Sequence, residues 1–131
     1  MHNMRQSISV LALILLLGCV SVPHEQMVLS RLYLGLSSPS GTVTSEHLDD
    51  FIGKEVTPRF PAFTRYQARG QWKDQKGTII HENTEIVEIV HRRTDLEERK
   101  IREIIQLYKA RFQQESVLLV EDHPHVEFNA D

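Results

Sequence analysis

The chain has 131 residues, of which 40% are hydrophobic and 25% are charged, a composition that allows one folded domain and excludes a disordered or collagen-like chain. Its formal net charge is −3, from 15 basic and 18 acidic residues, and no stripe of Lys and Arg runs along it, so we expect no nucleic-acid partner. The single cysteine excludes an intramolecular disulfide and a Cys-rich zinc site.

The N-terminal segment has the pattern of an export signal. An apolar block from Ile8 to Leu17 follows Arg5, and its ten residues match the core of a signal peptide, which is too short to span a bilayer. The sequence Leu16-Leu17-Gly18-Cys19 resembles a bacterial lipobox. We therefore predict a signal peptide over residues 1–18 and acylation of Cys19. An ordinary secretory peptide with a chance cysteine is the alternative. Val20 stands where an aspartate often retains a lipoprotein in the inner membrane, which favours an outer-membrane lipoprotein facing the periplasm.

A tether over residues 19–26 and a single domain over residues 27–131 are expected next. Apolar residues alternate from Met27 to Leu36 and predict the first strand. Turn residues follow over 37–41, and Thr44 is placed to cap a helix whose apolar face reaches Val56. Two prolines, at 58 and 61, end that helix.

The second half of the chain repeats this order. Alternation over 66–73 predicts a strand, a turn follows over 74–77, and the β-branched run over 78–91 predicts a long strand with a break at 82–84. Thr94 to Glu97 forms a capping box for a second helix with an apolar stripe over 101–112. A final strand is expected over 116–120.

The order strand, helix, strand, strand, helix, strand predicts an α+β fold of the ferredoxin-like βαββαβ type. In that topology an antiparallel sheet has its first and third strands in the middle and both helices on one face. The other face is open, and we expect the function to lie there.

Several stretches of the sequence are similar to a bacterial family of small envelope lipoproteins, domain of unknown function 3574. They are Arg31-Leu32-Tyr33-Leu34-Gly35-Leu36, Val56-Thr57-Pro58-Arg59-Phe60-Pro61, Gly70-Gln71-Trp72, and Tyr108 with Phe112-Gln113-Gln114-Glu115-Ser116-Val117-Leu118. The resemblance covers residues 31 to about 119. It implies a shared fold and an exported location, and it offers no activity or catalytic residue to carry over.

The sequence holds no recognisable catalytic motif, and we expect no cofactor and no metal site. His123-Pro124-His125 beside Glu121 and Asp122 is the best metal-like cluster, and it is more readily explained as surface histidines. His81 and His91 fall in the third strand, where single histidines are usually ordinary sheet residues.

Alternation along the strands suggests a polar cluster on the open face. Its candidate members are Arg31, Tyr33, Gln67, Arg69, Gln71 and Glu88. The simpler interpretation is a solvated face with cross-strand ion pairs such as Arg31 with Glu88. The sharper one is a pocket for a small anion, since two arginines can bind a carboxylate or phosphate. Tyr66 and Trp72 have the opposite parity and are interpreted as core residues or an aromatic anchor.

We therefore expect a non-catalytic interaction module, held at the membrane by its lipid anchor, with a second copy or another envelope protein as its partner. A small-ligand-binding protein or an enzyme that uses the open face is the alternative, and the sequence identifies no catalytic residue for it.

Overall fold

The computed structural model describes residues 26–129 of the chain. Its elements, in chain order, are β1 (Met27–Gly35), β2 (Ser37–Ser38), β3 (Gly41–Thr42), α1 (Ser45–Phe51), the π-helical turn η1 (Ile52–Val56), β4 (Thr64–Lys73), β5 (Ile79–Arg92), α2 (Asp95–Phe112) and β6 (Leu118–Asp122). The predicted signal peptide, Cys19 and almost all of the tether lie outside the described residues. Within residues 26–129, no helix is long and apolar enough to cross a membrane.

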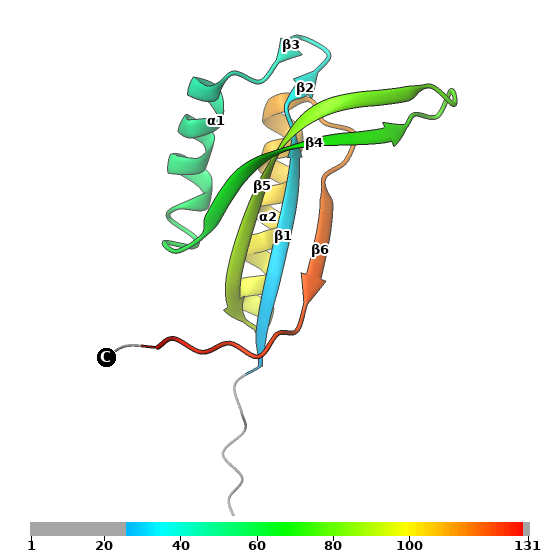
Figure 1. Cartoon of the computed structure of the whole chain (residues 1–131). Helices are drawn as coiled ribbons and strands as arrows, with labels where there is room; N and C mark the ends of the chain where they lie inside the picture. The colour runs from blue at the N-terminus through cyan, green and yellow to red at the C-terminus, as the bar shows by residue number, and fades with distance from the viewer. Residues whose placement is uncertain (1–25, 130–131) are drawn as a thin grey trace, which may run out of the picture.

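The main sheet has four strands in the order β4-β5-β1-β6, and every neighbouring pair is antiparallel. The predicted central position of the first and third strands is therefore confirmed, and the arrangement is the expected α+β fold of ferredoxin-like order. Figure 1 shows α2 running behind the sheet and α1 beside it, while the β4–β5 hairpin extends well past the other strands.

Both predicted helix starts are confirmed by their capping bonds. The backbone N–H of His47 donates to Oγ1 of Thr44, and that of Glu97 donates to Oγ1 of Thr94, each over 3.2 Å. These bonds satisfy amide groups that have no partner inside the helix. The first helix continues through η1 to Val56, and the second ends at Phe112 and is followed by Gln113, which adopts a left-handed conformation with φ of 52°.

The core lies between the helices and one face of the sheet. In β1 the residues that face the helices, including Leu32 and Leu34, are fully buried, while the residues between them are only partly buried. Phe51 of α1 meets Tyr108 of α2 edge to face, with ring centroids 5.1 Å apart. The two helices and the sheet therefore share one apolar cluster.

The predicted break at residues 82–84 is wrong. The pairing of β4 with β5 runs from Lys73 opposite Ile79 to Thr64 opposite Glu88 without an extra residue on either strand. The polar residues there do not require a bulge, because Glu82 and Asn83 keep access to solvent in the projecting hairpin (Figure 1), while Thr84 is buried and keeps its place in the pairing. The last strand also differs, since it begins at Leu118 rather than at residue 116.

Candidate functional site

The open face of the sheet presents alternate residues of all four strands. Arg31 of β1 lies opposite Glu88 of β5 on one side and Val120 of β6 on the other, and Tyr33 lies opposite Ile86 and Leu118 in the same way. Side chains directly opposite each other on neighbouring strands share a face. Of the predicted polar cluster, Arg31, Tyr33 and Glu88 are therefore brought together.

The other three predicted members are not on this face. Tyr66 of β4 pairs with Ile86, which also pairs with Tyr33, so the even-numbered residues of β4 share the open face with Arg31. Gln67, Arg69 and Gln71 consequently lie on the opposite side of the sheet. Alternation within a strand separates its two faces, but only the pairing register relates them to the faces of another strand.

Charged groups at the centre of the open face neutralise one another. The Nε of Arg31 donates to Oε1 of Glu88 over 2.8 Å, and its Nη1 donates to Oδ2 of Asp122 over 2.5 Å. The Tyr66 hydroxyl donates to the same Glu88 oxygen over 3.1 Å. Hydrogen bonds to Glu88 and Asp122 raise the pKa of Arg31, and partial burial, followed by the bond to Glu88, raises the pKa of Tyr66. The predicted Arg31 and Glu88 pair is confirmed.

Apolar side chains surround this ion-paired centre. Tyr66, Trp72, Val90 and Leu118 are 43%, 42%, 40% and 59% exposed, and all four belong to the open face. Tyr66 and Trp72 are thus aromatic residues of the open face rather than core residues. The alternation correctly placed Tyr66 and Trp72 on the other side of β4 from Gln67. However, it assigned Gln67, Arg69 and Gln71, instead of Tyr66 and Trp72, to the face of Arg31.

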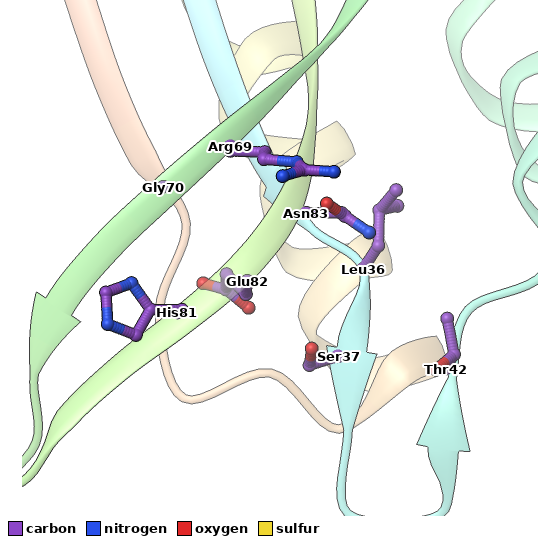
Figure 2. Close-up of a pocket in the computed structure, with 8 residues that line it drawn as sticks. All are labelled: Leu36, Ser37, Thr42, Arg69, Gly70, His81, Glu82 and Asn83. Atoms are coloured by element: carbon purple, nitrogen blue, oxygen red, sulfur yellow. The ribbon is translucent and has the colours of Figure 1, made fainter.

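Arg69 lines a different pocket, of about 430 Å³, between the β4–β5 hairpin and the small β2–β3 hairpin. Figure 2 shows Arg69, Asn83 and His81 on the longer hairpin and Ser37 and Thr42 on the shorter one. Within residues 26–129 the Arg69 guanidinium has no ion pair. The pocket therefore combines the Arg69 guanidinium with the Glu82 carboxylate and with polar side chains of both hairpins.

A buried polar cluster joins β1, β5 and the start of α2. The Oγ of Ser30 lies 2.8 Å from Nε2 of His91, whose Nδ1 donates to the Arg92 carbonyl over 2.9 Å. Glu97 places a carboxylate oxygen 3.6 Å from the same Nδ1. This order of groups resembles a Ser-His-acid triad, but Ser30 is 0% exposed and His91 is 4% exposed. Because no substrate can reach Ser30, the cluster holds the structure together.

The C-terminal histidines His123 and His125 line a cavity together with Gln26, Met27 and Arg93. His125 pairs with Glu127 at 2.8 Å, and no group of three or more metal-binding side chains occurs in the part of the chain that the structure describes.

Comparison with known proteins gives a family and a fold. Residues 29–128 match the family described as "Protein of unknown function (DUF3574)". No curated protein matches the sequence.

Three solved structures resemble the fold. A phage SAM lyase in complex with S-methyl-5'-thioadenosine is 18% identical with a TM-score of 0.62, over 76% of this chain and 83% of that one. A phage SAM lyase in the apo state is 22% identical with a TM-score of 0.54, over 75% and 81%. CutA from Synechococcus elongatus PCC7942 is 10% identical with a TM-score of 0.51, over 77% and 79%. At these identities the similarity concerns the fold alone.

Proposed function

Because the chain belongs to the DUF3574 family, whose description assigns no activity, we propose a function from the geometry of the open face: the protein is a non-catalytic interaction module that pairs with a second copy of itself. The observation that carries this proposal is the composition of that face. Around Arg31, Glu88 and Asp122, which are paired with one another, the large exposed side chains are apolar. Such a surface gains free energy when a partner excludes water from its apolar part.

A second copy is the partner that the face fits best. Most soluble oligomers are homo-oligomers, and a twofold interface uses the same patch on both subunits. The apolar residues Tyr66, Val90 and Leu118 frame a centre where Arg31 is matched by Glu88 and Asp122. When two such faces meet, the apolar side chains of one copy contact those of the other. Arg31 stays paired with Glu88 and Asp122, so the interface does not bury an unpaired arginine.

We propose further that the domain works at the outer membrane of the cell envelope, facing the periplasm. The lipobox-like Leu16 to Cys19 and the valine after it support this location. Eight residues of chain reach at most about 28 Å, so an acylated Cys19 would hold the domain within that distance of the bilayer. Acylation also confines both copies to one surface, which favours their encounter. Mass spectrometry of the mature N-terminus should show an acylated Cys19, and an unmodified N-terminus elsewhere contradicts the anchor.

Cysteine crosslinking in intact cells tests the pairing. If Cys19 carries a lipid on its sulfur, an engineered cysteine is the only free thiol in the chain. Val90→Cys places it on the open face, and Leu107→Cys places it on the outer side of α2, at nearly equal exposure of 40% and 36%. With a flexible bismaleimide, Val90→Cys should give a species of twice the chain mass, and neither Leu107→Cys nor the unchanged chain should.

The products distinguish the outcomes. A Val90→Cys product of any other mass identifies a different protein on the face and overturns the second copy as partner. Equal crosslinking from both positions, or none from Val90→Cys, overturns the open face as an interface.

A further inference from the structure

A second cavity lies at the Gly35 end of β1, on the open side of the β4–β5 hairpin. Its volume is about 420 Å³. The hairpin contributes Trp72 and Glu82, β1 contributes Tyr33 and Gly35, and the segment that follows α2 contributes Gln114. It adjoins the pocket of Figure 2 at Gly70 and Glu82, which line both. The cavity is thus built from three separate parts of the chain.

Two acceptor oxygens converge over Gly35. A Cβ atom on this glycine would lie 2.9 Å from Oε2 of Glu82 and 3.1 Å from Oε1 of Gln114. The Nε2 of Gln114 donates to the carbonyls of Ser37, over 2.6 Å, and Phe112, over 3.2 Å. Those two carbonyl partners fix the orientation of the amide, so its oxygen is the atom that lies near Gly35.

Neither oxygen receives a hydrogen bond from the described residues 26–129. A carboxylate oxygen and an amide oxygen that both lie near the same point above Gly35, and that accept no hydrogen bond there, are suited to a group that carries several N–H bonds. Because Gly35 has no side chain, nothing on this residue obstructs the approach of the Glu82 and Gln114 oxygens to it.

The charge of the residues that line the cavity also favours a cationic ligand. Glu82 and Glu115 are the charged residues that line the cavity, and both are acidic. Arg69 and His81, which Figure 2 shows in the adjoining pocket, form no ion pair with Glu82 in the described structure. Within residues 26–129 the Glu82 carboxylate therefore forms no ion pair, and a cationic ligand would supply one.

Aromatic side chains provide the rest of the wall. Trp72 is 42% exposed and Tyr33 is partly buried, and both line the cavity together with Ile80 and Leu118. Aromatic faces attract ammonium groups and pack against alkyl chains. The lining thus combines acceptors for N–H groups with an apolar surface.

We propose that this cavity binds a small organic molecule with a primary ammonium group and an apolar body. Glu82 and Gln114 accept hydrogen bonds from the ammonium, while Trp72 and Tyr33 contact the alkyl part. Such an ammonium occurs in free amines and in the headgroup of phosphatidylethanolamine. The cavity shares Trp72 and Leu118 with the open face, whereas Val90, where the pairing is tested, lies toward the opposite end of that face.

The test compares two molecules of nearly the same shape. Butylammonium chloride and the neutral butan-1-ol are titrated into the full-length protein in dodecyl maltoside micelles by calorimetry. Trp72 is the only tryptophan, so its fluorescence reports directly on this cavity. The amine should bind at least about tenfold more tightly than the alcohol and change the emission of Trp72, since charge-assisted hydrogen bonds discriminate by that order. Equal binding of the two molecules overturns the proposal.

A pair of variants locates the ammonium. Glu82→Gln keeps the size of the side chain and removes its charge, and it should weaken butylammonium binding about tenfold or more. Glu46→Gln makes the same change in the first turn of α1, away from the cavity, and should leave binding unchanged. Circular dichroism checks that both variants are folded. Unchanged binding by Glu82→Gln, or the same loss in both variants, contradicts the assignment.

Lipid in the micelles separates the two sources of the ammonium. Micelles doped with phosphatidylethanolamine are compared with micelles doped with phosphatidylglycerol. A Trp72 response to phosphatidylethanolamine that butylammonium displaces identifies the headgroup as ligand, whereas butylammonium binding without a lipid response identifies a free amine. No response to either overturns the site.

Discussion

The Tyr108 hydroxyl links the core of the protein to the floor of the proposed amine site. Tyr108 is 0% exposed, and its hydroxyl donates to the backbone carbonyl of Gly35 over 2.7 Å. Its ring packs against Phe112, with centroids 4.7 Å apart, and against Phe51. Replacement of Tyr108 by Phe keeps the ring and removes only the hydrogen bond.

The expected loss of unfolding free energy follows from the contacts that Tyr108→Phe keeps and the hydrogen bond that it removes. The ring contacts survive, so the loss is that of one buried hydrogen bond whose acceptor loses its partner, about 1 to 2 kcal/mol of unfolding free energy. Urea unfolding followed by circular dichroism measures it at neutral pH. Tyr66→Phe is the matched control, because the Tyr66 hydroxyl also donates a hydrogen bond but lies on a residue that is 43% exposed. It should cost less than about 0.5 kcal/mol.

The same hydroxyl predicts a dependence on pH. Burial, and then the nearby Glu82 and Glu85, raises the pKa of Tyr108. A group whose pKa is higher in the folded state contributes stability that is complete below the unfolded pKa and is lost as the pH rises through the folded one. At about pH 11 the unfolded chain gains about 1.4 kcal/mol from ionising this phenol, because the unfolded pKa is about 10.

The advantage of the unchanged protein over Tyr108→Phe should therefore shrink from about 1 to 2 kcal/mol at neutral pH to near zero at about pH 11. Comparing the two proteins at each pH cancels the titration of the other residues. A difference that stays constant up to about pH 11, or a neutral-pH cost equal to that of Tyr66→Phe, refutes this account of the hydroxyl.

Three further predictions concern the core. Ile104→Ala should lower the unfolding free energy by about 2 to 5 kcal/mol, because Ile104 is 1% exposed, and a loss below about 1 kcal/mol contradicts its core position. Burial raises the pKa of Glu85, against the opposing effect of Arg65, so Glu85→Gln should stabilise the protein above that raised pKa. This gain in unfolding free energy should disappear at acidic pH. Urea unfolding measured at acidic and at neutral pH tests both expectations for Glu85→Gln. Ser30→Ala should lower the unfolding free energy by about 1 to 2 kcal/mol. A fluorophosphonate should not label Ser30 of the folded protein, and labelling would instead show an accessible nucleophile.

The sequence by itself determined the local structure of this protein. Thr44 and Thr94 cap their helices through bonds to amides three residues away, so the signal and its effect lie within one turn. The stripe that includes Ile101 and Ile104 identifies the buried side of α2 because a single helix fixes the spacing of its own faces. The strand order then followed from the few topologies that join such elements.

Only the tertiary structure determines which residues form the open face and the cavity at Gly35. Arg69 was assigned to the face of Arg31 because alternation within β4 cannot show how that strand is registered against β5. The convergence of Glu82 and Gln114 over Gly35 joins three distant parts of the chain, and no local pattern encodes it. Helices and strands form from interactions between near neighbours, whereas a cavity is formed by whichever surfaces the packed elements bring together.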